Sequence, residues 1–375
     1  MPCINGGKSD NKKNIMKINI LQVIPEFGLA GAETMCEALC YEIQHSGKYN
    51  LFVASLFDYH SSITERMERQ GVNILYLHKN PGLDVYMIWK LYHLMKEKHI
   101  DVVHTHRHVM QYVVPAAIMA GVKIRVHTVH SIATKELGRV QRHFAKFFYK
   151  YCNVTPISIS PLVQKTVMDE YMLNEQRTPV IYNGSDLSKC IVKTDYAPSE
   201  PFTYLHIGRF SPVKNHRLMI EAAQRLKSEG YRFRINFVGG AGNEEQIKQE
   251  VVARELDNEI VFSGLQSNVY PFLSHSDCFI LPSAFEGMPI SLIEAMGTGL
   301  PIIASTVGGI PDMLQNEQSA LLINPTVDDL TDAMKKLYED ESLRKKIGRK
   351  ALEKSTRFSS EQMFGEYDKI YGQFK

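Results

Sequence analysis

The densest chemical signal in the sequence pairs two glutamates with glycines and prolines, in the segment EGMPISLIEAMGTGLP at residues 286–301. It follows an apolar run ending at Ser283, so we expect Glu286 on the loop at the carboxyl end of a strand. Pro289 suits the first turn of the next helix, whose free N–H groups would favour a diphosphate. Glu294 then falls in the second turn, where its carboxylate can accept hydrogen bonds from a ribose diol. Each glutamate alone would be an ordinary helix carboxylate, but together with the flanking glycines and prolines they predict a binding site.

A second segment, HIGRFSPVKN at 206–215, supplies cations. Gly208 ends an apolar β-branched run, and Arg209 and Lys214 follow five residues apart. Arginine offers a fixed fork of donors and lysine a point charge, which suits a diphosphate leaving group. Two cations on a loop are usually solvated, but their position after a strand that faces the same cleft favours the binding role.

A third segment, VGGIPD at 307–312, again stands between an expected strand and an expected helix. Gly308 and Gly309 allow close backbone approach, and Pro311 can begin a helix, so we expect a second anion-binding helix end. A tight turn without a ligand is the alternative.

The glycines of GLAGAE (28–33) follow the first expected strand. They resemble half of a dinucleotide fingerprint, but G-x-G-x-x-G is absent and no acidic residue ends the next strand. A nicotinamide cofactor is therefore not expected, and Gly31 is a better candidate for approach to a phosphate or an acceptor.

Several histidines cluster in the first half, at positions 104, 106, 108, 127 and 130. His106 and His130 stand at the carboxyl ends of neighbouring expected strands, and we expect neutral His130 to donate a hydrogen bond to a sugar hydroxyl. A purely structural role is the alternative for both. No carboxylate spacing supports a metal site and no D-x-D occurs, so no metal is expected.

The segment 135–151 predicts an amphipathic helix with a basic face and an aromatic face. Its cations are Arg139, Arg142, Lys146 and Lys150, and its apolar residues are Val140, Phe144, Phe147, Phe148 and Tyr151. Such a helix can lie on an anionic membrane. Alternatively, the aromatic face packs on the domain's own sheet; the basic first half slightly favours the membrane.

Short apolar runs alternate with helical periodicity through most of the chain, which predicts parallel sheets covered on both faces. Expected strands are 18–23, 51–56, 73–77, 101–106, 124–129 and 155–160, then 202–208, 233–239, 258–264, 277–283 and 300–305. Expected helices in the first half are 32–45, 61–70, 84–98, 109–120 and 135–151, and three helices, 327–338, 341–354 and 359–373, close the chain. A turn-rich linker, 183–201, separates two α/β repeats of this pattern. The fold class is therefore two doubly wound domains with a cleft at the carboxyl ends of their strands.

Composition narrows the protein class. The 375 residues are 44% hydrophobic with a net charge of +2, which suits two globular domains and argues against nucleic-acid binding through bulk charge. Residues 1–185 hold 21 Lys and Arg against 15 Asp and Glu, so the first half is basic. Six scattered cysteines without C-x-x-C, no long apolar stretch and a polar start predict a cytoplasmic protein. Residues 1–16 are expected to be a disordered extension.

The run GRFSPVKN, the paired glutamates within EGMP and EAMGTGLP, and the GGIPD turn resemble glycosyltransferase family 4, the retaining enzymes of GT-B fold. NGSD (183–186) is similar to that family's interdomain motif, with Ser185 where an apolar residue is usual, and Asp312 stands where Glu is commoner. The likeness runs from about 17 to 373, and it is strongest to bacterial enzymes that build capsular, exopolysaccharide or O-antigen glycans.

The resemblance implies a fold and a set of roles. Residues 17–185, with a crossing helix at 359–375, would form an acceptor domain, and 186–358 a donor domain. Arg209 and Lys214 would hold the donor diphosphate, Glu294 the ribose and Glu286 the transferred sugar. His130 would contact the reacting centre, and Gly31 and His106 the acceptor or a phosphate. Further donor contacts are expected at Gly208, Leu265, Gly287, Met288, Gly308 and Gly309.

The function expected from the resemblance is transfer of a sugar from a UDP- or GDP-sugar to a glycan or lipid-linked acceptor, with retention and without a metal or other cofactor. Such a protein could touch the inner face of the plasma membrane through 135–151. The alternatives are a GT-B nucleotide-sugar epimerase, a two-domain sugar-binding protein and, least favoured, a dehydrogenase.

Overall fold

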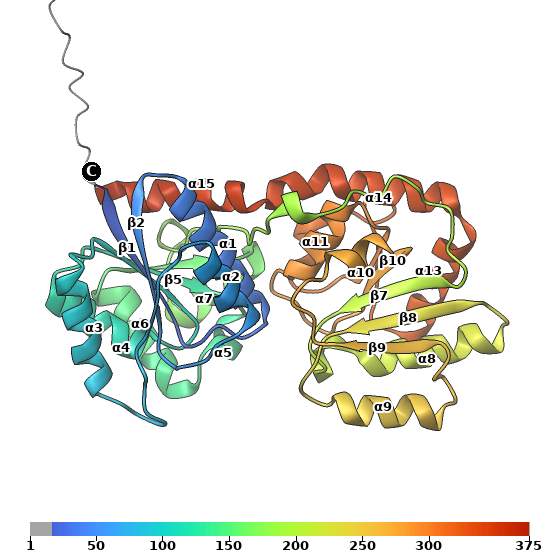
Figure 1. The fold of residues 1–375 in the computed structure, drawn as a ribbon, viewed down its shortest axis with the longest axis horizontal. Helices are drawn as coiled ribbons and strands as arrows, with labels where there is room; N and C mark the ends of the chain where they lie inside the picture. The colour runs from blue at the N-terminus through green and yellow to red at the C-terminus, as the bar shows by residue number, and fades with distance from the viewer. Residues whose placement is uncertain (1–16, 375) are drawn as a thin grey trace, which may run out of the picture.

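Two six-stranded parallel sheets form two lobes that lie side by side in the computed structural model, which describes residues 17–374 (Figure 1). The predicted extension at 1–16 lies outside the described residues. The first sheet contains β1 (Ile18–Ile24), β2 (Tyr49–Ser55), β3 (Ile74–Tyr76), β4 (Val102–His106), β5 (Ile124–Val129) and β6 (Val154–Ser158). The second contains β7 (Phe202–Ile207), β8 (Phe233–Val238), β9 (Ile260–Gly264), β10 (Cys278–Leu281), β11 (Ile302–Ser305) and β12 (Leu321–Ile323).

The two sheets have the same topology. Their strand orders are β3-β2-β1-β4-β5-β6 and β12-β11-β10-β7-β8-β9. In each sheet the order reverses between the first and the fourth strand of the lobe, β1 and β4 or β7 and β10. Loops at the carboxyl ends of these strands diverge to opposite faces of the sheet and leave a crevice. The GT-B fold of two facing Rossmann-like lobes is confirmed.

The helices connect the strands and cover the sheets. In the first lobe they are α1 (Gly31–His45), α2 (Ser62–Arg69), α3 (Tyr86–Glu97), α4 (Met110–Ala120), α5 (Ala133–Glu136), α6 (Arg139–Tyr151) and α7 (Pro161–Tyr171). The second lobe has α8 (His216–Ser228), α9 (Glu244–Ala253), α10 (Tyr270–Ser274), α11 (Ile290–Thr298), α12 (Ile310–Met313), α13 (Val327–Glu339) and α14 (Glu341–Ser355), and α15 (Ser360–Tyr371) follows. No helix within 17–374 combines the length and apolar character needed to cross a membrane.

The eleven expected strands are all present, and the sequence prediction missed the twelfth, β12, as well as α7. The predicted single helix over 135–151 is wrong. Leu137 is extended, and Gly138 begins a new helix as the N-cap of α6, so the segment divides into α5 and α6.

The last helix crosses back to the first lobe, as predicted, and forms the red band along the top of Figure 1 together with α14. The linker crosses beside it: Ser185 N–H donates to the Phe358 carbonyl at 3.1 Å, and Ser360 N–H donates to the Ser185 carbonyl at 2.9 Å. A Cβ on Gly184 would lie 2.5 Å from the Ser359 carbonyl oxygen, so only glycine allows this approach.

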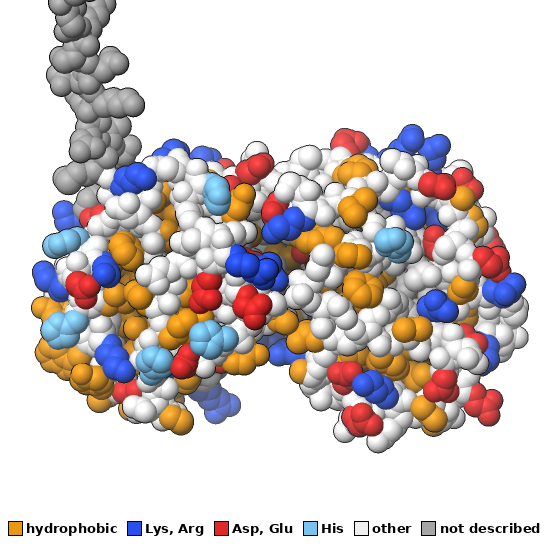
Figure 2. Space-filling model, in the orientation of Figure 1, with side chains coloured by type: hydrophobic (Ala, Val, Ile, Leu, Met, Phe, Trp, Pro, Cys, Tyr) orange, Lys and Arg blue, Asp and Glu red, His pale blue; other side chains and the backbone are white. Residues whose placement is uncertain are grey.

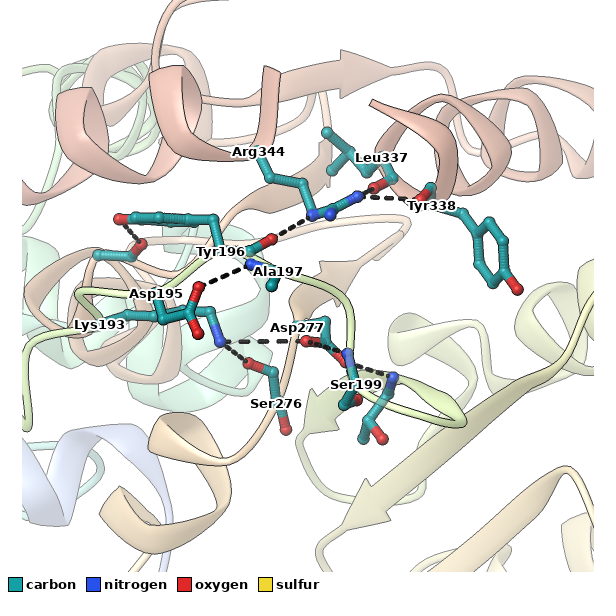
Figure 3. A network of polar contacts seen from close by, with 12 residues as sticks. Lys193, Asp195, Tyr196, Ala197, Ser199, Ser276, Asp277, Leu337, Tyr338 and Arg344 are labelled. Carbon is teal, nitrogen blue, oxygen red and sulfur yellow. Dashed lines mark hydrogen bonds and ion pairs between the residues drawn. The ribbon is translucent and has the colours of Figure 1, made fainter. Parts of the chain in front are cut away.

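A buried polar network fastens the rest of the linker to the second lobe (Figure 3). The Arg344 guanidinium, on α14, donates to the carbonyl oxygens of Tyr196, Leu337 and Tyr338 at 2.7–2.9 Å. Nearby, Asp277 accepts from the Thr203 N–H at 2.8 Å and from Ser199. These bonds fix the path of the chain into β7.

We expect Arg344→Met to lower the free energy of unfolding by roughly 3 kcal/mol, because three buried carbonyl groups lose a charged donor. Urea unfolding followed by circular dichroism measures the change. Lys350→Met on the same helix is the control, since the ion pair of Lys350 within the described residues is with Glu353 at the surface, and its loss should change stability by less than about 0.5 kcal/mol. Equal effects of the two substitutions would contradict a structural role for the network.

Candidate functional site

Loops from both lobes meet at the crevice, where Figure 2 shows basic and acidic side chains gathered at the junction. A Cβ on Gly287 would lie 3.0 Å from the carbonyl oxygen of His130, in the other lobe. A Cβ on Gly31 would lie 3.8 Å from the side chain of Ile290. Gly287 and Ile290 of the second lobe are therefore neighbours of His130 and Gly31 of the first lobe across the crevice.

In the second lobe, the candidate site is centred on an ion pair between Lys214 and Glu286. Lys214 Nζ lies 2.6 Å from Glu286 Oε1, and Ser283 Oγ donates to the same oxygen at 2.6 Å. Glu286 is buried, and among residues 17–374 the bonds to its carboxylate all go to Oε1, which leaves the second oxygen, Oε2, without a protein partner. The cation and the carboxylate thus hold each other in place, while one oxygen stays available to a ligand.

The backbone positions this pair by joining two loops. Ala284 N–H, after β10, donates to the Val213 carbonyl at 2.8 Å, and Asn215 Nδ2 donates to the Pro282 carbonyl at 2.8 Å. Lys214 ends a short 3₁₀ turn, and Asn215 follows in the left-handed region with φ of 54°. Asparagine tolerates that conformation better than most residues, so the sequence K-N itself favours the turn.

The neighbouring Arg209 lies apart from the ion pair. Its side chain is exposed, and it forms no ion pair within the described part of the chain. Glycine at position 208 lets the loop pass close to the Lys214 side chain, since a Cβ there would lie 3.2 Å from Lys214 Cε. The two predicted cations therefore share a loop but differ in environment: Lys214 is fixed and Arg209 is open to solvent.

The glycine pair of the third segment packs on the backbone that carries Glu286. A Cβ on Gly308, whose φ is 61°, would lie 1.6 Å from the Glu286 carbonyl oxygen, and one on Gly309 would lie 2.1 Å from that of Gly287. Gly309 N–H also donates to the Glu286 carbonyl at 3.2 Å. The following helix, α12, has four residues. The glycines therefore support the glutamate loop, and their contact with a donor stays a prediction.

Glu294 occupies a separate, buried position on α11. Burial raises the pKa of this carboxyl to about 7, although Tyr270 OH and Ser185 Oγ donate to Oε1 at 3.4 and 3.5 Å. Ser185, the departure from the family's linker motif, thus has a partner in the second lobe. Pro289 is the N-cap of α11 rather than a residue of its first turn, and it provides no side-chain cap.

Two of the predicted donor-binding residues lie at the edges of this region. Met288 is buried against the linker, where its carbonyl oxygen accepts from Asn183 Nδ2 at 3.0 Å. Leu265 is exposed on the loop after β9, and a Cβ on Gly240 would lie 3.3 Å from its Cβ.

The first lobe contributes a chain of buried hydrogen bonds that begins at His130. His130 Nε2 lies 3.1 Å from His106 Nδ1, and His106 Nε2 lies 2.9 Å from Gln22 Oε1. Gln22 Nε2 donates to Tyr371 OH at 3.3 Å, which links the crevice to the last helix. From Tyr371 the chain continues through bonds of 2.7 Å each that join His104, Thr128 and Tyr367. We call this set, from His130 to Tyr367, the histidine relay.

The relay sets the tautomers of its histidines. Gln22 Oε1 can only accept, so His106 donates from Nε2 and accepts at Nδ1, and His130 donates its Nε2–H to His106. Burial lowers the pKa of His104, His106 and His130 well below the ordinary value, so all three are neutral at pH 7. The unprotonated Nδ1 of His130 is then left to accept a hydrogen bond. This is the reverse of the predicted donor role.

Other charged groups near the crevice had no recognisable signal in the sequence. Arg107, in the left-handed region with φ of 57°, forms an ion pair with the buried Glu33 of α1. Burial raises the pKa of Glu136, on α5, to about 7. Arg66, on α2, donates to the Ser267 carbonyl of the other lobe at 3.2 Å. Such pairs join distant segments, which no local spacing reveals. Within 17–374 no three His, Cys, Asp or Glu residues are grouped to hold a metal ion.

The aromatic side of α6 is exposed rather than packed on the sheet. Ala145, Phe148 and Tyr149 face the core. The side chains that remain exposed are Val140, Phe144, Phe147 and Tyr151. The predicted alternative in which the whole aromatic face of this segment packs on the sheet is therefore wrong, because only Phe148 of that face is buried.

Comparison with known proteins places the chain among sugar-transferring enzymes. The family model described as Glycosyltransferase Family 4 matches residues 29–189, and the one described as Glycosyl transferases group 1 matches 193–354. A galactosyltransferase of Escherichia coli, UDP-Gal:alpha-D-GlcNAc-diphosphoundecaprenol alpha-1,3-galactosyltransferase, is 29% identical over 69% of this chain and 72% of its own. N-acetyl-alpha-D-glucosaminyl L-malate synthase of Bacillus anthracis is 27% identical over 80% and 82%.

Solved structures show the same fold at lower identity. Anabaena HepE in complex with UDP and glucose superposes with a TM-score of 0.82 at 18% identity, covering 95% of this chain and 100% of its own. A glycosyltransferase from Rickettsia africae gives 0.81 at 18% identity, with 96% and 98% covered.

We expect stability to fall as pH drops from 7.5 to 5, because buried neutral histidines take up protons only on unfolding. Burial lowers the pKa of His127 to about 3 and of His216 to about 4 in the folded chain, against about 6.5 unfolded. Each such histidine lowers the free energy of unfolding by about 1.4 kcal/mol per pH unit below 6.5. Glu136 and Glu294, with raised pKa, act in the opposite direction but are fewer.

Urea unfolding at both pH values tests this linkage. His127→Gln removes one titrating group that lies outside the histidine relay, so the loss between pH 7.5 and 5 should shrink by about 2 kcal/mol. Parallel losses in the two proteins would show that His127 does not titrate on unfolding.

Proposed function

The chain belongs to the family 4 glycosyltransferases of GT-B fold, and from that premise we propose that it transfers a hexose from a nucleoside-diphosphate-sugar to a hydroxyl of a glycan or lipid-linked acceptor, with retention of the anomeric configuration. The observation that carries the proposal is the Lys214–Glu286 pair, joined at 2.6 Å at the carboxyl ends of β7 and β10. A cation suits the diphosphate and a carboxylate suits sugar hydroxyls, so the bond between phosphate and sugar would lie between them.

The reaction breaks the bond between the anomeric carbon and the leaving diphosphate oxygen and forms one from that carbon to the acceptor oxygen. The acceptor's proton passes to the leaving phosphate on the same face. Lys214, with Arg209 free to close over the ligand, stabilises the negative charge that develops on the diphosphate. Since these residues supply positive charge, we propose that transfer needs no added metal. His130 Nδ1 accepts a hydrogen bond from a hydroxyl of the transferred sugar.

Glu294 and its surroundings are proposed as the ribose site. Its carboxyl has a pKa of about 7 because it is buried, so it is half ionised near neutral pH and can accept from the ribose diol. Leu265 and Gly240 would border the base, while Gly287 and Met288 lie at the start of the uncapped helix α11, whose N–H groups can bind phosphate.

The biological setting is proposed from the relatives. The E. coli galactosyltransferase is named for a UDP-sugar donor and a diphosphoundecaprenol acceptor, and other relatives are named for colanic acid and amylovoran biosynthesis. We propose that this chain builds a cell-surface polysaccharide, such as a capsule or exopolysaccharide, at the inner face of the plasma membrane. The exposed aromatic side of α6 would touch that membrane.

Donor binding is the first test. A thermal-shift panel of UDP, GDP and ADP in EDTA should show stabilisation by one of the three nucleotides. Glu294→Gln, which keeps the shape of the side chain but loses its charge, should weaken the affinity for that nucleotide about tenfold. Absence of any shift from well-folded protein would remove the donor site.

Turnover is the second test. We expect Lys214→Ala to lower kcat by about 100- to 1,000-fold without lowering stability by a comparable amount, because the transition-state charge loses its fixed partner. Lys227→Ala, at a surface lysine of α8 that pairs with Glu259, is the matched control. Near-normal turnover by the Lys214 variant would exclude it from the mechanism. Nuclear magnetic resonance of the product checks the anomer, and release of an epimerised nucleotide sugar without an acceptor would indicate the epimerase instead.

A further inference from the structure

An apolar groove of about 1,000 Å³ runs along the first lobe, beside the crevice. Helix α4 forms its floor, with α3 and the preceding loop on one side and α6 on the other. Its lining includes Leu83, Ile88, Tyr112, Val140, Phe144 and Phe147. In Figure 2 hydrophobic side chains gather at the lower left, over the position of α3 in Figure 1.

Both walls of the groove leave large apolar side chains in solvent. On the α3 side Leu83 is 81% exposed, and Val85, Tyr86 and Trp89 are also exposed. On the α6 side Val140 is 70% exposed, and Phe144 and Phe147 are 51% exposed. A contiguous patch of this kind is costly in water and marks a surface that binds something apolar.

The charge around the groove is one-sided. Lys79 is the one Lys, Arg, Asp or Glu side chain that lines the groove in the described part of the chain, and the helices that wall it, α3 and α6, also carry Lys90, Lys96, Arg139 and Lys150 against Glu97. An apolar channel with a basic border complements a molecule that has a hydrocarbon chain and an anionic head. It is a poor fit to a second copy of the same surface, because the basic borders of two copies would repel each other.

The inner end of the groove lies at the strand ends that carry the histidine relay. Pro25, Phe57 and His108 line it, and they follow β1, β2 and β4 by one or two residues. His108 is two residues from His106, so their Cα atoms lie within about 7 Å. A chain lying in the groove would therefore bring its polar head to the crevice next to His130.

We propose that this groove holds the hydrocarbon chain of a lipid-linked acceptor, so that the acceptor's anionic head lies at the crevice. The inference rests on the proposed function and narrows its acceptor class from glycans in general to lipid-linked ones. The groove is large enough for such a chain, since ligand sites commonly enclose about 300–1,000 Å³.

The probe is a series of n-alkyl phosphates with 8, 10 and 12 carbons, each below the concentration at which it forms micelles, with inorganic phosphate as the blank. Trp89 is the only tryptophan of the chain and follows Ile88, a lining residue of the groove, on α3, so its fluorescence serves as the readout. We expect a blue shift, and an affinity that rises at least about tenfold from the 8- to the 12-carbon chain because buried methylene groups add up.

Two matched variants locate the binding. Phe144→Ser, within the groove, should weaken the 12-carbon phosphate at least about fivefold. Tyr151→Ser removes a more exposed ring of α6, 74% against 51% for Phe144, that does not line the groove, and it should change affinity less than about twofold. Circular dichroism confirms that both variants fold.

Three outcomes would overturn the inference: no dependence on chain length, equal losses in the two variants, or a blue shift that tracks protein self-association in sedimentation. Binding to anionic vesicles without binding to the monomeric alkyl phosphates would likewise replace the groove with a membrane-surface contact. The UDP, GDP and ADP panel separates these results from the proposed function. Nucleotide stabilisation without chain-length dependence removes the lipid groove alone, whereas loss of nucleotide binding removes the transferase.

Discussion

The crevice depends on the close packing of the two segments that cross between the lobes, the linker at Gly184 and the returning segment at Ser359. Gly184 leaves no room for a side chain against the Ser359 carbonyl, and backbone bonds at Ser185 hold the outgoing linker to the returning segment. Because neither lobe contains a complete set of polar groups, their relative position decides whether the groups can act together. The same linker also supplies Ser185 to Glu294 and Asn183 to Met288, so it belongs to the site as well as to the scaffold.

Each lobe brings its own pre-arranged polar set to the crevice. In the second lobe, the Gly308–Gly309 turn supports the loop on which Glu286 binds Lys214. In the first lobe, the histidine relay holds neutral rings in fixed tautomers. The two sets approach where Gly287 packs on the His130 carbonyl. Groups that are oriented before a ligand arrives need little reorganisation during reaction, and this is the main way in which a buried polar site lowers a barrier.

The sequence predicted most of what depends on local pattern. Alternating apolar runs located eleven of twelve strands, including the three-residue β3, and missed only β12, which is equally short. Motifs located Lys214 and Glu286, because strand–loop–helix spacing is local. The relay could not be found in this way: Gln22 and Tyr371 are 349 positions apart, and the bond between them leaves no trace in either neighbourhood. The hydrogen bonds of His130 within the relay follow from those distant partners, so its role could not be predicted from its own neighbourhood in the sequence.

The contact between Tyr371 and His104 also ties the first lobe to the order in which the chain is made. These residues are 267 positions apart, and the tyrosine lies in the last turn of α15. While a ribosome is still extending the chain beyond β4, the buried His104 ring lacks the Tyr371 hydroxyl that its Nδ1 hydrogen-bonds in the folded protein. The hydrogen-bonded set of the first lobe is therefore complete only after residue 371 has been made and α15 has packed against the sheet.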